Sequence, residues 1–399
     1  MYDLFKAIYF LLRQVINILR CLTLRIRGKK FIIYCGQTHS PHFRSFLRSF
    51  HKHNKIQYFT MCSYPNFDNS LRTCIFDQSL SVILLQRCSI EQFENSIYNR
   101  GANPIYGISL INSILKLLQP QVVWFHELQS SSYFIDDTVL NNIPVICTTI
   151  YGNDIKYFKD LPQHYPKISR ILSKSHLLHA ETFLELAPFE NILKNARLVC
   201  ASATLRKYTK NNIALGTDNK EIDIIIRAGS GYRVNSFPIF DFIKNHHNAL
   251  KSKKIVLFDA NEIDTFLYNK LANEFCLDIQ IYPRLQRDEL EILFQKSKVL
   301  INNSLCDGVS NLSVEAILNS CIVITSKNNA ISEFYTPKQI QHYIFSDPFN
   351  EKLVLKIINI NEKVIRADIE LIQTKLLKYF SDIKIEKLVN AFDDVTLRI

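Results

Sequence analysis

Two acidic residues in the second half of the chain have a spacing that suits ligand binding. Asp307 and Glu315 are eight positions apart in the segment LINNSLCDGVSNLSVEAILNSCIVITSKNNAISEFY, which runs from 300 to 335. An apolar strand precedes Asp307, and Glu315 is expected in the first turn of the helix that follows. Carboxylates only accept hydrogen bonds, so two of them can hold sugar hydroxyls on either side of a diphosphate. Free N–H groups at the start of that helix would favour the phosphate; the residues concerned are Gly308, Val309, Ser310 and Asn311.

Two arginines lie in the turn after the first apolar strand of the same half. Arg227 and Arg233 enclose Gly229 and Gly231, and glycine lets a backbone approach a ligand without a Cβ in the way. Fixed cations beside such a backbone could bind an anionic ligand. Alternatives to ligand binding stay open for these residues. Glu315 can simply complement the helix dipole, and the two arginines can be exposed to solvent without a ligand.

Polar residues also follow several predicted strands of the first half. Ligands of open parallel α/β sheets bind outside the carboxyl ends of the strands, so these residues are candidates for a binding site: Gly36 on the side of one substrate, and Gln37, Thr38, Tyr151, Asn153 and Asp154 on the side of a second. Among them the histidine is a candidate acid or base, with a buried structural histidine as the alternative. The residues concerned are Gly36, Gln37, Thr38, His126, Tyr151, Asn153 and Asp154.

Short apolar runs alternate with amphipathic stretches from residue 31 onward. Because the runs are continuous, they indicate parallel strands that helices bury on both faces. Strands are predicted over 31–35, 56–61, 81–85, 122–125, 145–149, 177–179 and 198–201, and again over 222–226, 254–258, 277–281, 299–301 and 322–325. Helices are predicted over 43–52, 107–118, 237–250, 265–275, 287–297 and 313–319, and 350–395 also has a helical pattern.

This pattern divides the chain into two Rossmann-like parallel α/β domains that face each other across a cleft. The first domain covers 31–205 and the second covers 222–360, with the polar stretch 206–221 as a linker between them. Helices over 361–399 are expected to pack back toward the first domain. The predicted fold class is α/β.

The acidic segment resembles the signature of the group-1, GT4-like glycosyltransferases, which have the GT-B fold. Their pattern is Glu, seven residues, Glu, then a helix and a PVI-A-S strand, and here Asp307 and Glu315 are followed by CIVITS over 321–326. The similarity extends from about residue 222 to 360, which makes the second domain the one that binds a nucleotide sugar. It implies that Glu315 binds the nucleotide ribose and that Asp307, one methylene shorter than Glu, contacts the donor sugar.

The resemblance implies roles for the other candidates as well. Relatives hold the donor diphosphate with an Arg and a Lys five residues later, where this chain has Arg227 and Arg233. Arg284 occupies the turn that lies beside the nucleotide base, and Gly36 begins the loop nearest the diphosphate and the acceptor. The turn from Tyr151 to Asp154 is similar to the family's His-Gly-Ser-Asp turn, with tyrosine in place of histidine.

The first thirty residues combine apolar and basic side chains. Seven Lys or Arg residues against the single acid Asp3 give this segment +6 of the net charge of +11. Within 4–24, Lys6, Arg13 and Arg20 are seven apart and share one helix face, which predicts a helix in the plane of a membrane rather than a span. Arg25 to Lys30 would add contacts with anionic lipid. The alternative is a helix that packs on the body of the protein.

The composition excludes several classes of protein. A chain of 399 residues with 47% hydrophobic and 21% charged residues is neither collagen-like nor disordered. Its ten cysteines include no C-x-x-C pair, which excludes zinc-ribbon and thioredoxin motifs and indicates a reducing compartment. The resemblance implies a reaction that needs neither a metal nor another cofactor, and the absence of an Asp-x-Asp motif agrees with this expectation. Nucleic-acid binding is not expected either, because basic residues are not interleaved with aromatics beyond the first thirty residues.

The sequence therefore predicts a glycosyltransferase that is cytoplasmic and peripheral on the cytoplasmic face of a membrane. It would move a sugar from a nucleotide-sugar donor to a glycan or lipid-linked acceptor in the synthesis of a cell-envelope polysaccharide such as lipopolysaccharide. The resemblance also implies retention of configuration. Two alternatives stay open: a sugar-nucleotide epimerase, which shares the GT-B fold, and a non-catalytic relative that binds a nucleotide sugar.

Overall fold

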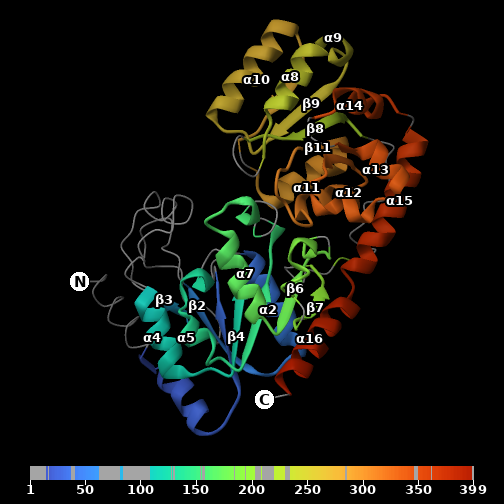
Figure 1. Ribbon diagram of the computed structural model, residues 1–399. Coiled ribbons are helices and arrows are strands. Elements are labelled where there is room, and N and C mark those ends of the chain that lie inside the picture. The colour runs from blue at the N-terminus through green and yellow to red at the C-terminus, as the bar shows by residue number, and fades with distance from the viewer. Residues whose placement is uncertain are drawn as a thin grey trace. The chain divides into compact units, whose positions relative to one another are not determined.

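The computed structural model divides into two compact units (Figure 1). The N-terminal unit comprises Met1–Arg206 and Asp382–Ile399, and the C-terminal unit comprises Lys207–Ser381. The structure describes 15–36 except 17, 41–62, 81–83, 108–202 except 127, 129–130, 153, 155–157, 184 and 194, then 208, 220–283 except 230–233, 285–345, and 349–397 except 361.

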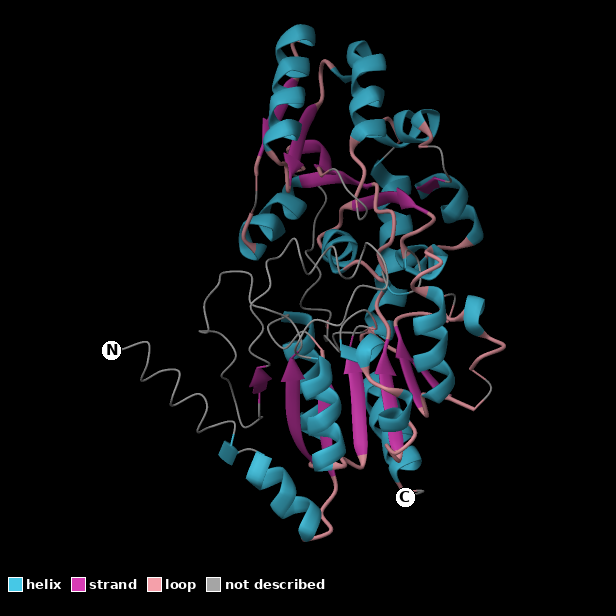
Figure 2. Ribbon diagram, turned by 60° about the vertical axis from the view of Figure 1, so that its left-hand side comes forward, coloured by secondary structure: helices cyan, strands magenta, loops and turns pink. Residues whose placement is uncertain are grey.

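The N-terminal unit is built on a seven-stranded parallel sheet in the order β3-β2-β1-β4-β5-β6-β7. Figure 2 shows its strand arrows running in one direction. The strands are β1 (Phe31–Cys35), β2 (Gln57–Cys62), β3 (Ser81–Ile83), β4 (Val122–His126), β5 (Val145–Thr149), β6 (Leu177–Ala180) and β7 (Arg197–Cys200). The helices are α2 (Pro41–His53), α4 (Ile108–Leu118), η1 (Ser131–Phe134), α5 (Asp137–Leu140), η2 (Phe158–Asp160), α7 (Tyr165–Lys174), η3 (Ala187–Phe189) and α16 (Asp382–Thr396).

Helices cover both faces of this sheet, which explains why β1 is buried and without a charged or strongly polar residue along its whole length. Ile32 of β1 belongs to a core shared with α2 and with Phe392 of α16. The next residue, Ile33, belongs to a second core shared with Leu115 of α4 and Leu172 of α7. Successive side chains of a strand point to opposite faces, so a strand buried on both sides needs an unbroken apolar run.

The C-terminal unit holds a six-stranded parallel sheet in the order β10-β9-β8-β11-β12-β13. Its strands are β8 (Ile222–Arg227), β9 (Lys254–Phe258), β10 (Asp278–Ile281), β11 (Ser297–Asn302), β12 (Ile322–Ser326) and β13 (Ile344–Phe345). Its helices are α8 (Phe237–Asn245), α9 (His247–Leu250), α10 (Glu262–Phe275), α11 (Arg287–Lys296), α12 (Asn311–Leu318), η5 (Ala330–Phe334), α13 (Pro337–Tyr343), α14 (Glu351–Ile358) and α15 (Glu362–Tyr379).

The predicted parallel α/β class is confirmed, and each predicted strand has an observed counterpart. The sequence analysis missed α7, α13 and the two-residue strand β13. α13 and β13 are too short to show a clear period, whereas α7 buries Ile168, Ile171 and Leu172 at helical spacing and could have been predicted. The single helix predicted over 237–250 is interrupted at His246 and gives α8 and α9. The helical stretch 350–395 forms three helices, of which α15 belongs to the C-terminal unit and α16 to the N-terminal unit.

Part of the basic N-terminal segment lies among the described residues, and 18–26 are helical. One face of this helix packs on the N-terminal unit through buried Cys21 and its neighbours, while Leu19 and Ile26 are exposed. Two basic residues of the stretch from Arg25 to Lys30 contact protein: Arg25 donates to the Leu117 carbonyl at 2.9 Å and Lys30 to the Thr396 carbonyl at 2.8 Å. The expected contact of this stretch with lipid stays a prediction. Among the described residues, no helix is both long and apolar enough to cross a bilayer.

Candidate functional site

Three neighbouring strands of the C-terminal unit bring charged residues to one edge of the sheet. β8 lies between β9 and β11, and all three are parallel, so their carboxyl ends meet. Arg227 is the last residue of β8, Asp259 directly follows β9, and Asp307 lies in the loop after β11. Because ligands of parallel sheets bind at this end of the strands, the edge is the first place to look for a site.

Arg227 is held between two carboxylates at this edge. Its Nη1 donates to Oδ2 of Asp307 at 3.2 Å, and its Nε lies 3.6 Å from Oδ2 of Asp259. The side chains of Arg227 and Asp307 are each 22% exposed, so the cation is partly shielded from water and still reachable. A guanidinium fixed in this way is suited to binding an anion such as a diphosphate.

Asp259 is a site residue that the sequence analysis missed. It has a positive φ of 59°, a left-handed conformation that non-glycine residues rarely adopt. The sequence does contain a signal for Asp259. It is a small polar residue directly after an apolar strand, and that strand ends level with the strand that carries Arg227. Its carboxylate adds negative charge next to the cation.

The loop after β11 is braced by its own polar contacts. Ser304 Oγ accepts the N–H of Asp307 at 3.2 Å, and the Gly308 carbonyl accepts the N–H of Ala330 at 3.1 Å. Ser310 caps α12 by accepting the N–H of Ser313 at 3.4 Å. These contacts place Gly308, Val309, Ser310 and Asn311 at the start of the helix, where the sequence analysis expected them.

Glu315 lies on α12, but not where the sequence analysis expected it. The helix begins at Asn311, so Glu315 is its fifth residue, and the first turn carries no acidic side chain. The prediction of a first-turn position is therefore wrong, because the helix starts two residues before the predicted 313. This position also weakens the helix-dipole explanation for Glu315, since that effect is confined to the first turn.

Two residues that are distant in sequence hold the Glu315 carboxylate. Arg287, at the start of α11, approaches Oε1 of Glu315 at 2.9 Å, and the Tyr208 hydroxyl donates to the same oxygen at 3.3 Å. Tyr208, from the stretch expected to be a linker, is buried in the core of the C-terminal unit and contacts the Phe380 ring. The Glu315 side chain is only 14% exposed, so its carboxylate is oriented before any ligand arrives.

The turn that begins at Arg227 is fixed at both described ends. Gly229 has a φ of 132°, which favours glycine, and its carbonyl accepts the N–H of Ser236 at 3.0 Å. Asn303 donates its side-chain amide to the Asn235 carbonyl at 2.6 Å, and the N–H of Asn235 donates back to the Asn303 carbonyl at 3.2 Å. Asn303 thus ties the end of this turn to the end of β11.

The strand ends of the N-terminal unit have a different character. His126, the last residue of β4, is 1% exposed and sits among aromatic rings, with the Phe46 and Phe43 ring centroids at 4.3 and 4.7 Å. Its Nδ1 lies 3.5 Å from the Tyr151 hydroxyl. Burial, with a smaller contribution from His179, lowers the pKa of His126 well below its ordinary value, so the imidazole is neutral near pH 7.

Two further candidates of this unit support the local backbone. Asp154 is fully buried, and its carboxylate accepts the N–H groups of Tyr151 at 3.0 Å and Leu128 at 3.3 Å. Gly36 follows β1, and a Cβ at this position would lie 2.6 Å from the His126 carbonyl oxygen. Gly36 therefore permits the close approach of the chain after β1 to the end of β4.

Several predicted site residues lie outside the described residues, and their roles stay predictions. They are Gln37, Thr38, Asn153, Arg233 and Arg284. Within the described part of the chain, no group of three or more His, Cys, Asp or Glu side chains is arranged to hold a metal ion.

Comparison with known sequences gives little. No family model matches the chain. Among curated proteins, the probable polyketide synthase 5 of Dictyostelium discoideum is 30% identical over 174 residues, which cover 40% of this chain. That match spans 6% of the synthase, so it supports no assignment of function.

Comparison with solved structures is more informative. Trehalose-6-phosphate synthase OtsA aligns over 92% of this chain and 99% of its own, with a TM-score of 0.63 and 12% identity. HepE of Anabaena, solved with UDP-glucose, covers 90% of this chain and 98% of its own at a TM-score of 0.60 and 10% identity. A glycosyltransferase of Rickettsia africae covers 92% and 98% at a TM-score of 0.58 and 14% identity. The chain therefore has the GT-B fold, as the sequence resemblance implied.

Proposed function

We propose that this protein is a glycosyltransferase that moves a sugar from a nucleotide-sugar donor to an acceptor. The observation that carries the proposal is the edge of the C-terminal sheet, where Arg227 is flanked by carboxylates and Glu315 is held nearby on α12. The GT-B fold supports it, and a structure of the same fold with UDP-glucose makes a uridine diphosphate sugar the first donor to test.

Arg227 would stabilise the departing diphosphate. Negative charge develops on the leaving phosphate as the bond to the sugar breaks, and a cation already fixed in place lowers the barrier. When the diphosphate takes Nη1 of Arg227, Asp307 loses its 3.2 Å partner and becomes an acceptor for a hydroxyl of the donor sugar. Because the arginine supplies the positive charge, we propose that the reaction needs no divalent metal and that EDTA leaves its rate unchanged.

Glu315 would bind the ribose of the donor. Two adjacent ribose hydroxyls both donate, and a carboxylate can accept from both. The contacts from Arg287 and Tyr208 hold this carboxylate in one orientation, so less rotamer entropy is lost when the donor binds.

The N-terminal unit would supply the acceptor side of the reaction. His126 was a candidate acid or base, but its burial and its lowered pKa make it a weak base that solvent barely reaches, so we propose that it shapes the acceptor side rather than transferring a proton. We further propose a glycan or lipid-linked acceptor, a role in cell-envelope polysaccharide synthesis, transfer with retention, and attachment to the cytoplasmic face of a membrane. The apolar and basic first thirty residues support the membrane part of this proposal.

The test is nucleotide release from a panel of UDP-, GDP-, ADP- and CMP-sugars, with and without membrane lipids. Two variants accompany the wild type: Glu315→Ala, and Glu291→Ala as a control on an exposed residue of α11. We expect lipid-stimulated release from one donor, lost in Glu315→Ala and kept in Glu291→Ala. Conversion of the donor without nucleotide release would instead make the protein an epimerase, and binding of a donor without turnover would make it a binding protein.

A further inference from the structure

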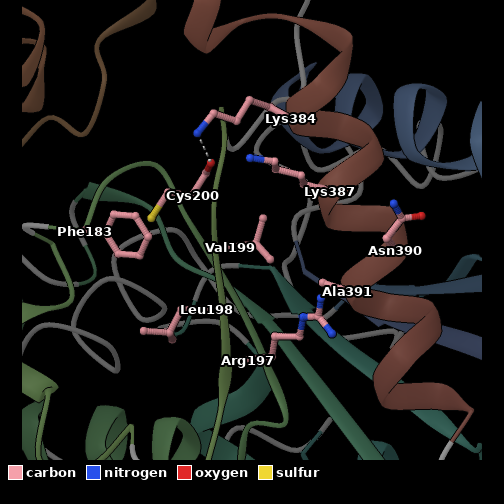
Figure 3. A pocket seen from close by; sticks show the side chains of 9 residues that line it. All are labelled: Phe183, Arg197, Leu198, Val199, Cys200, Lys384, Lys387, Asn390 and Ala391. Carbon is pink, nitrogen blue, oxygen red and sulfur yellow. Dashed lines mark hydrogen bonds between the residues drawn. The ribbon is translucent and has the colours of Figure 1, made fainter.

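The arginine at the end of β8 lies among more negative charge than one anion-binding cation needs. Oδ2 of Asp259 is 3.6 Å from Nε of Arg227, and Oδ2 of Asp307 is 3.2 Å from its Nη1. In contrast, Arg197, which lines the pocket shown in Figure 3, forms an ion pair with one carboxylate, that of Asp394. Two carboxylates for one guanidinium leave an excess of negative charge where the donor diphosphate is proposed to bind.

The backbone fixes the position of Asp259 at the end of β9. Ala228 donates its N–H to the Phe258 carbonyl at 2.8 Å, which ties the end of β8 to the residue before Asp259. On the other side, Ala260 donates its N–H to the Tyr282 carbonyl at 3.3 Å. Because the backbone is held at both neighbours, the carboxylate can move away from the arginine only by rotation of the side chain.

The conformation of Asp259 points to a use for its side chain. Glycine would adopt its φ of 59° at lower cost, and residues held in such conformations are concentrated at functional sites. The Asp259 side chain is 42% exposed, and among the described residues its carboxylate has no ion-pair or hydrogen-bond partner other than Arg227. The carboxylate therefore acts on the arginine and on any anion that binds beside it.

The two carboxylates differ in what a bound diphosphate does to them. Asp307 contacts Nη1 of Arg227, the atom that the diphosphate would take, whereas Asp259 faces Nε and keeps its place when Nη1 is occupied. A negative group that stays beside the arginine repels the phosphates that bind there. This repulsion is stronger for a nucleoside diphosphate than for its sugar ester, because a terminal phosphate with a second pKa of about 6 carries additional charge near pH 7.

From this arrangement we infer that Asp259 promotes release of the nucleoside diphosphate product. Its carboxylate competes with the diphosphate for Arg227 and weakens the binding of the product more than the binding of the donor. Asp259 contacts none of the reacting atoms in this role, so it is a positioning residue that acts through the arginine. The inference rests on the proposed function, because it requires that a donor diphosphate binds at Arg227.

Calorimetric titration with UDP, and with GDP and ADP in parallel, tests the inference on the wild type and two variants. Asp259→Asn removes the charge and keeps a residue type that tolerates a positive φ, and it should bind the nucleotide at least about threefold more tightly than the wild type. Asp278→Asn removes the same charge from the first residue of β10, at the opposite edge of the sheet, and should bind as the wild type does. Damage to the fold would weaken binding, so it cannot produce the expected gain.

Two further comparisons separate charge repulsion from relief of backbone strain. The gain in Asp259→Asn should be larger for UDP than for UDP-glucose, and it should shrink when NaCl is raised from about 20 mM to about 500 mM, because salt screens exposed charges. A gain that is independent of salt, or equal in Asp278→Asn, would overturn the inference. Equal or weaker binding in Asp259→Asn would also overturn it and leave the proposed function intact, whereas absence of nucleotide binding in the wild type and the variants would overturn both.

Discussion

The ionisable groups at the strand ends of the two units differ in their exposure to water and in their hydrogen-bond partners. In the C-terminal unit, Arg227, Asp307 and Glu315 are partly exposed and paired with other side chains. In the N-terminal unit, His126 is enclosed by aromatic rings and Asp154 is occupied by backbone amides. Charges that can exchange one partner for another suit the binding and release of an anion, whereas buried neutral groups shape a surface. The comparison therefore favours the C-terminal unit as the source of charged groups for the proposed reaction.

The largest effect is expected from removing the central cation of the C-terminal unit. In Arg227→Met the leaving diphosphate loses its fixed positive charge, and the rate constant of nucleotide release should fall by about 10²–10³. Lys338→Met removes an exposed positive charge from α13 of the same unit and should keep full activity. Equal rates for the two variants would place the charge chemistry elsewhere.

Acid should destabilise the N-terminal unit through its buried histidines. Burial lowers the pKa of His179 from 6.5 to about 4. Below pH 6.5 the unfolded chain takes up a proton that the folded unit excludes, so stability falls as the pH drops from 6.5 to about 4. The loss reaches about 3 kcal/mol for this residue. His51, whose pKa burial also lowers to about 4, adds to the same trend.

Thermal unfolding followed by tryptophan fluorescence measures this trend, because Trp124 of β4 is the single tryptophan of the chain. The dependence on pH between 6.5 and 4 should be shallower in His179→Asn and unchanged in His342→Asn, a variant of the C-terminal unit. A wild-type melting temperature that is constant over this range would contradict the assignment of buried neutral histidines.

A smaller loss of stability is expected from a methyl group at Gly36. The new Cβ would lie 2.6 Å from the His126 carbonyl oxygen and 2.8 Å from the His126 Cβ, so β1 and β4 must shift, at a cost of about 1–3 kcal/mol. Gly28→Ala is the matched control, because a Cβ there meets nothing within 4 Å and carries only the strain of a φ of 63°, about 1 kcal/mol. Urea unfolding of both variants should rank Gly36→Ala as the less stable.

The smallest effect concerns the residue that orients Glu315. Arg287 is 57% exposed, and an exposed ion pair contributes about 0.2–1 kcal/mol. Arg287→Gln should therefore raise the KM for the donor by up to about fivefold and leave kcat unchanged. A change in kcat with constant KM would mean that Arg287 acts on the transition state rather than on donor binding.

The strands of both sheets could be predicted from the sequence, and so could the segment of the candidate site that contains Asp307 and Glu315. Continuous apolar runs identify buried parallel strands, and the spacing from Asp307 to Glu315 marks the segment around α12. The partners of these residues could not be found in this way. Tyr208 is 107 residues from Glu315 and Asp259 belongs to another strand than Asp307, so their meeting depends on the order of strands in the sheet. The burial of His126 could not be predicted either, because nothing in the local sequence distinguishes a buried histidine at this position from an exposed one.

Amide hydrogen exchange with and without UDP, and with GDP and ADP in parallel, tests the central claim most directly. The account predicts that one nucleotide slows exchange at the end of β8, in the loop after β11 and in the first turn of α12, and leaves the segments around His126 and Asp154 unchanged. Protection confined to the N-terminal unit, or none with any nucleotide at saturating concentration, would contradict it.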